Sequence, residues 1–373
     1  HASLAGSPGR VRIGVDGVLL GLGPDGASRR TLSLLPGLAA EGIDVVLYTG
    51  SASTLVPRGA VDVVRVDVPA RPAWVRTATM GRIGRRLAKD GVQVFLTGPS
   101  PLPGPWPVPV VATLHDLRKR RFVQTLRRIA LLRAARVIVP SRFTRREAIR
   151  QLGLDESRIT VIPNAADHLE RPEPGPGAAT GPLLAVGHLH PRKNLRVLVE
   201  TVAILRHVNA ERRLVLAGRD FQGEQSRLSV LAQRLGVSDL VEFTGEVEES
   251  GLAGMYAAAC AVCVPSWHEG FGLAVAEAMY CGAPVIVSRG GALPEVAGPA
   301  AQVADGRRPL EWAAAVRRLE GAAERQAWID QGRDRAGDWS WRRAASETAA
   351  VLQSAAVSGV GAEPMLDATH LAP

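Results

Sequence analysis

The sequence has few cysteines, few aromatic residues and no long hydrophobic run, and each shortage excludes a class of protein. Its three cysteines, Cys260, Cys263 and Cys281, are too few for a disulfide scaffold in a chain of 373 residues. No window reaches the roughly 18 uninterrupted apolar residues of a membrane span, and no signal peptide is recognisable. We therefore expect a cytoplasmic protein, either free or peripheral on the inner face of the plasma membrane.

Familiar catalytic and metal-binding motifs are also missing. The sequence lacks a G-x-S-x-G elbow, an H-E-x-x-H pair and a G-x-x-x-x-G-K-[ST] phosphate loop. The Cys260-x-x-Cys263 pair has no second pair of Cys or His at ligand spacing, so we interpret these cysteines as buried small hydrophobic residues. The residues predict no metal site.

Positive charge is concentrated in the first half of the chain. Residues 1–167 carry 25 Lys or Arg against 12 Asp or Glu, a net charge of +13, whereas residues 168–373 carry 20 against 24, a net charge of −4. A basic half favours an anionic partner, such as an acidic membrane surface or an anionic acceptor molecule. A general preference for arginine explains the charge equally well, because only three residues are lysine.

The most basic segment, residues 118–136, has eight basic residues and no acidic one. Its interleaved apolar residues predict an ordinary surface helix, which we favour, or a helix lying on an anionic membrane. Nucleic acid is disfavoured as a partner because no stacking aromatics alternate with the arginines.

The order of the predicted elements indicates an α/β fold. Short apolar strands alternate with helical patterns along the chain, and Ser141 is placed to cap a helix at 142–152. Strands are predicted at residues 11–15, 43–49, 61–68, 92–97, 110–114, 137–139, 159–162, 183–186, 213–217, 241–244, 261–264 and 284–287. We expect two Rossmann-like, doubly wound domains facing each other across a cleft.

Composition indicates where the predicted domains begin and end. A segment rich in Pro and Gly interrupts the alternation, and the last residues have no periodicity. The predicted parts are an N-terminal domain (1–167), a linker (168–181), a C-terminal domain (182–338), a final helix (339–356) and a flexible tail (357–373).

One segment in the second half combines two carboxylates with a helix start. Residues 264–282, V-P-S-W-H-E-G-F-G-L-A-V-A-E-A-M-Y-C-G, read as a strand, a polar turn and a helix beginning at Phe271. Glu269 lies in the turn and Glu277 about two turns inside the helix, on a similar face. Free N–H groups between them would stabilise an anion. This pattern suits a ligand with sugar hydroxyls and a phosphate.

A second segment offers positive charge at another helix start. Residues 187–194, G-H-L-H-P-R-K-N, follow a predicted strand, and Arg192 and Lys193 would lie beside free N–H groups as a diphosphate clamp. A solvated helix start is the plainer interpretation. Other candidates lie at strand ends or in glycine-rich turns: Gly26, His115, Gly187, Gly218, Arg219 and Glu295. The plainer interpretations are a simple strand-to-helix connection for Gly26, a structural histidine for His115 and a helix-start acid for Glu295.

Together these segments resemble the GT-B retaining glycosyltransferases of family 4. The resemblance covers about residues 10–355, and its most specific element is the E-x7-E motif with E-G-F-G. The segments T-L-H-D-L, V-I-P-N-A-A-D and G-G-A-L-P-E-V also match. The resemblance implies a nucleotide-sugar donor held mainly by the C-terminal domain, an acceptor held mainly by the N-terminal domain, and a final helix that returns to the N-terminal domain. It also implies transfer with retention of configuration, without a metal or other cofactor.

The resemblance assigns roles by position. Glu269 would lie by the donor sugar hydroxyls, Glu277 would hold the ribose, and Arg192 and Lys193 would neutralise the diphosphate. Further residues implied at the active site are His115, Gly26 and the backbone segment Gly270, Phe271, Gly272 and Leu273.

Three positions depart from the family pattern. His188 stands where many members have Arg, so the phosphate charge would rest on Arg192 and Lys193. The segment N-A-A-D replaces N-G-V-D, and Ala274 replaces a frequent Pro.

The predicted function is therefore retaining transfer of a hexosyl group from a nucleotide diphosphate sugar. The P-R-K-N variant resembles mannosyltransferases that use GDP-mannose. A glycan, a lipid-linked molecule or a natural product would be the acceptor. The alternatives are a GT-B epimerase or hydrolase that acts without an acceptor, and a non-catalytic nucleotide-binding scaffold.

Overall fold

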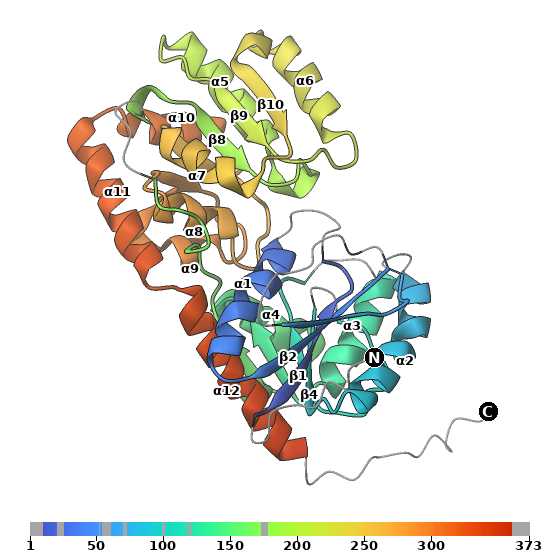
Figure 1. Cartoon of the computed structure of the whole chain (residues 1–373). Coiled ribbons are helices and arrows are strands. Elements are labelled where there is room, and N and C mark those ends of the chain that lie inside the picture. The colour runs from blue at the N-terminus through green and yellow to red at the C-terminus, as the bar shows by residue number, and fades with distance from the viewer. Residues whose placement is uncertain are drawn as a thin grey trace. The chain divides into compact units, whose positions relative to one another are not determined.

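The computed structural model describes residues 10–20, 26–51, 53, 61–69, 73–98, 101–117, 121–172 and 178–359. These residues divide into two compact units (Figure 1). The first unit takes its residues from His1–Val139, Glu147–Ile162 and Ala345–Pro373, and the second from Pro140–Arg146 and Pro163–Ala344. Helices α4 (Arg142–Leu152) and α12 (Trp341–Gly359) therefore contribute residues to both units.

The first unit contains a parallel sheet with the strand order β3-β2-β1-β4-β5-β6-β7. The strands are β1 (Arg12–Gly17), β2 (Asp44–Thr49), β3 (Asp62–Arg65), β4 (Val94–Thr97), β5 (Val110–Thr113), β6 (Arg136–Val139) and β7 (Ile159–Val161). The helices are α1 (Gly26–Ala40), α2 (Ala73–Lys89), α3 (Arg121–Arg133) and α4. Strands β1, β4 and β5 are buried along their whole length, as their apolar runs predict for a parallel sheet covered on both faces.

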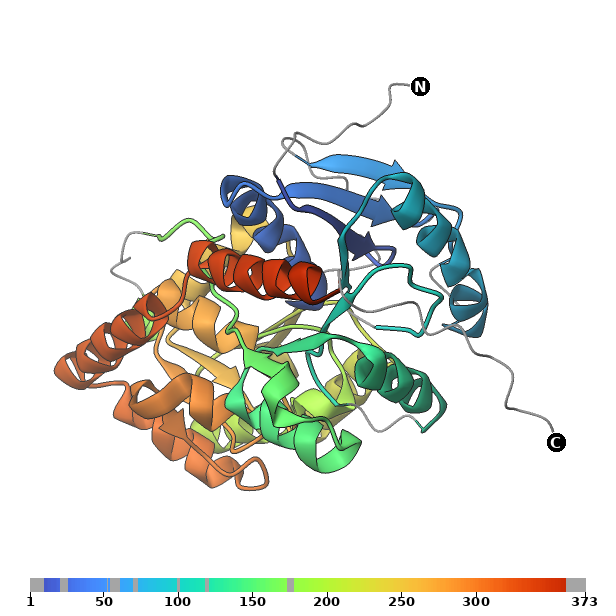
Figure 2. The ribbon, with the colours of Figure 1, turned by 90° about the horizontal axis from the view of Figure 1, so that it is seen from below.

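Helices α2 and α3 pack beside this sheet (Figure 2). Met80 and Ile83 of α2 join the same core cluster as Leu131 of α3 and Phe95 of β4. Helix α3 takes up residues 121–133 of the basic segment, whose residues 118–120 lie outside the described residues. Its Leu126 and Leu131 pack on the core of the first unit, as expected for an ordinary surface helix.

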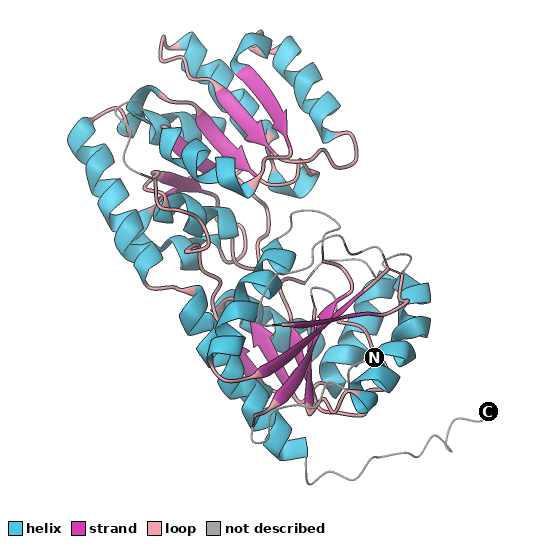
Figure 3. Cartoon of the chain, viewed as in Figure 1, coloured by secondary structure: helices cyan, strands magenta, loops and turns pink. Residues whose placement is uncertain are grey.

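The second unit contains a parallel sheet with the order β10-β9-β8-β11-β12-β13 (Figure 3). The strands are β8 (Leu183–Val186), β9 (Leu214–Ala217), β10 (Val241–Gly245), β11 (Ala261–Val264), β12 (Val285–Val287) and β13 (Gln302–Val303). The helices are α5 (Arg196–His207), α6 (Glu224–Arg234), α7 (Glu249–Ala258), α8 (Leu273–Tyr280), α9 (Leu293–Ala297), α10 (Pro309–Arg318), α11 (Ala322–Gly337) and α12. Short 3₁₀ turns across the chain are η1 (Glu156–Arg158), η2 (Ala178–Thr180), η3 (Pro191–Lys193), η4 (Ser238–Leu240) and η5 (Gly298–Ala300).

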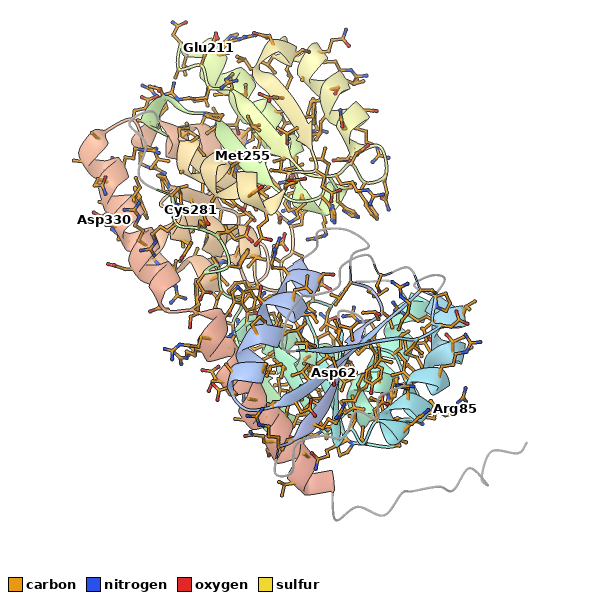
Figure 4. The ribbon with its side chains drawn as sticks, viewed as in Figure 1. Asp62, Arg85, Glu211, Met255, Cys281 and Asp330 are labelled. Carbon is orange, nitrogen blue, oxygen red and sulfur yellow. The ribbon has the colours of Figure 1, made fainter. Side chains whose placement is uncertain are left out.

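Successive side chains of the central strands pack into two different core clusters, one on each face of this sheet. Val262 packs with Tyr256 of α7 and Met279 of α8, whereas its neighbour Cys263 packs with Trp312 of α10. Cys260, Cys263 and Cys281 are buried free thiols, as expected (Figure 4 labels Cys281, after α8). Burial raises the pKa of all three thiols.

The predicted fold class is confirmed, with local differences. Helix α8 begins at Leu273, not Phe271, because Gly272 adopts a left-handed φ of 92°. Strand β3 stops at Arg65, where the expected strand ran to Val68, and the N–H of Val68 bonds the carbonyl of Val66 in a turn. Strand β13 was not expected, because two residues show no periodicity. The helix start suggested at Glu295 is present as the five-residue helix α9. None of the described helices is both long and apolar enough to span a bilayer.

Candidate active site

The strand order of the second sheet reverses between β8 and β11, and the loops after these two strands lie side by side. Ligands of doubly wound folds bind beyond the carboxyl ends of strands at such a reversal. The N–H of Trp267, in the loop after β11, bonds the carbonyl of Arg192, in the loop after β8, at 2.9 Å. Asn194, with a left-handed φ of 53°, donates to the carbonyl of Pro265 at 3.2 Å. These bonds hold the two predicted ligand segments together.

The carboxylate of Glu269 is the meeting point of the two loops. Its Oε1 lies 2.7 Å from Nζ of Lys193 and 3.2 Å from Nη1 of Arg192. The hydroxyl of Ser266 donates to the same oxygen at 2.8 Å. All three of these donors bind Oε1, and no described residue donates to Oε2. Gly187 faces the lysine, because a Cβ there would lie 3.4 Å from Nζ of Lys193.

The start of α8 presents unpaired backbone donors next to this cluster. Helix α8 has no side-chain cap, and the N–H groups of Phe271, Gly272 and Leu273 donate to none of the described residues. A Cβ on Gly272 would lie 2.6 Å from Cδ2 of Leu293, a side-chain end that can shift, so glycine is favoured there mainly by its φ of 92°. The helix dipole and these N–H groups favour an anion.

The carbonyl of Gly270 is fixed by the first turn of α4, which belongs to the second unit. Ser141 donates to it at 2.7 Å and Thr144 at 2.9 Å. Because a trans peptide directs its C=O and N–H oppositely, this anchoring turns the N–H of Phe271 away from α4. Ser141 also accepts from the N–H of Thr144 at 3.0 Å, which confirms it as the cap of α4.

Glu295 caps the same helix from outside. Its two carboxylate oxygens accept from the N–H groups of Arg142 at 2.7 Å and Phe143 at 2.8 Å. Of the two interpretations of Glu295, the helix-start acid describes this geometry, although the capped helix is α4 and not α9. A donor contact for Glu295 stays a prediction.

Glu277 lies inside α8 and is buried, with 6% of its surface exposed. Its Oε2 accepts from the hydroxyl of Tyr256 at 2.7 Å, and its Oε1 lies 3.4 Å from Nε2 of His168. Burial and the neighbouring Glu277 raise the pKa of Tyr256 well above its usual value. Among the described residues, no hydrogen bond joins the carboxylates of Glu277 and Glu269.

The tips of β8 and β9 approach closely through glycine. A Cβ on Gly218 would lie 2.1 Å from the carbonyl oxygen of Gly187, and the N–H of Gly218 bonds the carbonyl of Gly245 at 2.7 Å. The carbonyl of Arg219 accepts from the N–H of Leu189 at 2.9 Å, and the residue is exposed at the strand tip.

The remaining predicted residues belong to the first unit. Gly26 is the exposed first residue of α1, and residues 21–25 of its loop lie outside the described residues. His115 follows β5 and is half-buried. Their roles stay predictions. In the part of the chain that the structure describes, no three His, Cys, Asp or Glu side chains are grouped to hold a metal ion.

Comparison with protein families covers both halves of the chain. A family described as "Glycosyltransferase Family 4" matches residues 24–168, and one described as "Glycosyl transferases group 1" matches residues 177–335. The chain belongs to the family 4 glycosyltransferases.

Curated relatives and solved structures agree with this membership. This family 4 chain is 32% identical to D-inositol 3-phosphate glycosyltransferase 2 of Catenulispora acidiphila over 66% of its length and 65% of the relative. It is 30% identical to O-antigen chain mannosyltransferase B of Escherichia coli over 63% of its length and 64% of the relative. The matches thus span slightly less than two thirds of these relatives.

Two solved structures have the same fold. Sucrose-phosphate synthase from Thermosynechococcus elongatus has a TM-score of 0.79 at 21% identity, covering 94% of this chain and all (100%) of that one. Anabaena Alr3699/HepE in complex with UDP-glucose has a TM-score of 0.74 at 18% identity, covering 92% of this chain and 100% of that one. These likenesses establish the GT-B fold of this family 4 member.

Sequence reasoning missed several side chains that shape the candidate site of this family 4 member. They are Ser141, Thr144, His168, Tyr256, Ser266 and Trp341. Only Ser141 carried a local signal, that of a helix cap. Ser266 lies only three positions before Glu269, whereas Thr144, His168, Tyr256 and Trp341 come from distant segments, so spacing along the chain does not reveal them.

The acid stability of the protein should depend on Glu269. Burial alone would raise the pKa of Glu269, but Lys193, Arg192 and Ser266 lower it from 4.5 to about 2. A lowered folded-state pKa adds stability above the unfolded-state pKa, and this stability is lost as the pH falls from about 4.5 toward 2. Between pH 6 and pH 3 we expect wild type to lose about 2 kcal/mol more unfolding free energy than Glu269→Gln. Urea unfolding measures this; equal losses would contradict the ion-pair geometry.

Proposed function

We propose that this chain is a glycosyltransferase that moves a hexosyl group from a nucleotide diphosphate sugar to an acceptor. The observation that carries the proposal is the convergence of Lys193, Arg192 and Glu269 beside the unpaired N–H groups at the start of α8. Two cations and free backbone donors suit a diphosphate. A carboxylate oxygen left open beside them suits the hydroxyls of the sugar attached to it.

The proposed chemistry follows from the charges that develop in the reaction. Breaking the bond between sugar and phosphate leaves negative charge on the diphosphate, which Arg192, Lys193 and the helix N–H groups would stabilise. Glu269 pairs with both cations, and these ion pairs would hold its carboxylate in place for the donor. The contribution of the protein is therefore mainly electrostatic and geometric.

We further propose that transfer retains the anomeric configuration without a protein nucleophile or a metal. Glu269 has a pKa of about 2 and three donors on Oε1, so it is a weak base and a weak nucleophile. The leaving phosphate would instead accept the proton of the acceptor hydroxyl, on the face where attack occurs. Activity should then survive EDTA.

The donor and acceptor are proposed from the sequence and from the curated relatives. GDP-mannose is the proposed donor, supported by the P-R-K-N segment and by the mannosyltransferase among the relatives. The basic first half supports an anionic acceptor, either a soluble phosphate such as the D-inositol 3-phosphate of the relative's name or a lipid-linked molecule at an acidic membrane. The second source would place the enzyme peripherally on the inner face of the plasma membrane.

A thermal-shift panel tests the donor site directly. GDP-mannose, UDP-glucose, UDP-N-acetylglucosamine and dTDP-glucose are each added to wild type and to Lys193→Ala. At about 100 times its Kd, a true donor should stabilise wild type by about 2.7 kcal/mol, a shift of several degrees, and Lys193→Ala far less. Release of nucleoside diphosphate that requires an acceptor then separates transfer from hydrolysis. Failure of every nucleotide sugar to stabilise wild type would contradict the proposed function.

A further inference from the structure

A buried chain of polar groups connects Glu277 to the start of α12. The hydroxyl of Tyr256 donates to Oε2 of Glu277 at 2.7 Å, and Nε2 of His168 lies 3.4 Å from Oε1. On the other side of the imidazole, the indole N–H of Trp341 donates to Nδ1 of His168 at 3.1 Å. The backbone N–H of Trp341 donates to Asp167 at 2.9 Å. All five residues belong to the second unit.

The tryptophan determines which nitrogen of His168 carries the proton. An indole N–H only donates, so Nδ1 of His168 must accept, and the proton of the neutral ring lies on Nε2. That N–H is buried and has no hydrogen-bond partner among the described residues, and Oε1 of Glu277 lies 3.4 Å from Nε2. The side chains of His168 and Glu277 are 8% and 7% exposed, so water does not replace the protein groups there.

We propose that His168 and Tyr256 are positioning residues for Glu277. This inference rests on the proposed function, in which Glu277 accepts a hydroxyl of the donor ribose. A buried carboxylate needs donors to keep its charge and orientation, and unsatisfied polar groups there are costly. The hydroxyl of Tyr256 donates to Oε2 of Glu277, and the Nε2–H of His168 is close enough to donate to Oε1 after a small shift. Trp341 holds the imidazole with that N–H toward the carboxylate.

The chain converges from three separate segments, which explains why no motif marks it. Tyr256 lies in α7, His168 follows β7, and Trp341 opens α12. Tyr256 and His168 both reach the carboxylate of Glu277, and Trp341 reaches it through His168. A purely structural role would affect stability without distinguishing one ligand from another, whereas a positioning role affects the recognition of ribose.

Two amide substitutions distinguish the role of Nε2 of His168 from the role of its Nδ1. The amide N–H of His168→Gln can occupy the place of Nε2–H and donate to Glu277. The amide of His168→Asn reaches only the place of Nδ1, so it can accept from Trp341 but leaves Glu277 without this donor. Calorimetric titrations of each full-length variant with GDP, UDP and inorganic diphosphate compare nucleotide binding with binding of the phosphates alone.

Of GDP and UDP, one will bind wild type more tightly. We expect His168→Asn to lower the affinity for that nucleotide about tenfold, the effect of losing one hydrogen bond to a charged group. Inorganic diphosphate should bind as it does to wild type, and His168→Gln should restore most of the nucleotide affinity. Tyr256→Phe should show the same selective loss and serves as the second variant if His168→Asn does not fold.

The outcomes distinguish this inference from the proposed function. If wild type binds neither nucleotide, the ribose role of Glu277 is overturned. The same holds if Glu277→Gln binds the nucleotide with the affinity of wild type. If Glu277→Gln loses affinity selectively while both His168→Asn and Tyr256→Phe bind like wild type, only the positioning inference is wrong. An equal loss for nucleotide and inorganic diphosphate in folded variants also overturns it.

Discussion

Lys193→Ala is expected to lower kcat/KM for the nucleotide sugar by roughly 10²–10³-fold, the usual effect of removing one donor that stabilises developing negative charge. Lys193 is only 17% exposed and touches Glu269 at 2.7 Å, so its charge acts in a partly dehydrated site. The substitution also removes the strongest attraction that lowers the pKa of Glu269. Both the diphosphate and the carboxylate would lose their partner.

Lys89→Ala is the matched control for this prediction. Lys89 ends α2 on the surface of the first unit, and it is the other lysine that the structure describes. The same atoms are removed, and the net charge changes equally. Initial rates of nucleoside diphosphate release should therefore match wild type for Lys89→Ala. Equal rates for Lys193→Ala and wild type would contradict the diphosphate clamp.

Gly290→Ala is expected to lower both stability and activity, because it displaces the loop that carries Glu269. A Cβ at position 290 would lie 1.9 Å from the carbonyl oxygen of Ser266, which no small shift relieves. The same turn holds the loop that carries Glu269, because the N–H of Ala292 bonds the carbonyl of Glu269 at 2.8 Å. Overpacking costs about 1–3 kcal/mol, and a displacement of about 1 Å in a catalytic group lowers activity by about 10²-fold.

Gly254→Ala provides the control for this second prediction. Gly254 is exposed inside α7, and a Cβ there meets nothing within 4 Å. We expect unchanged activity and a small gain in stability, since alanine favours the helix by about 0.5–1 kcal/mol over glycine. Melting temperatures and initial rates of Gly290→Ala and Gly254→Ala test this prediction. A Gly290→Ala protein as stable and active as Gly254→Ala would show that the loop is not held as described.

Local patterns in the sequence account for most of the strands and helices of both units. The resemblance assigned Glu269, Arg192 and Lys193 to one donor site, but the sequence did not predict the ion pairs that join them. The start of α8 was misplaced by two residues, since only the backbone shows the left-handed Gly272.

Long-range contacts could not be predicted. Ser141 reaches Gly270 across 129 positions, and Trp341 reaches His168 across 173. Glu295 has the position of a helix-start acid, yet it caps a helix whose N–H groups come from Arg142 and Phe143. Such contacts follow from how separate segments pack, and no spacing along the chain encodes them.

The central claim is that Arg192 and Lys193 bind the diphosphate of a nucleotide donor. Calorimetric titration of wild type and Lys193→Ala with a nucleoside diphosphate and the matching monophosphate tests it most directly. Wild type should bind the diphosphate at least about tenfold more tightly, as expected for a charge-assisted hydrogen bond to the second phosphate. In Lys193→Ala this preference should largely disappear. A wild type that does not distinguish the two nucleotides, or a variant that keeps the full preference, would contradict the account.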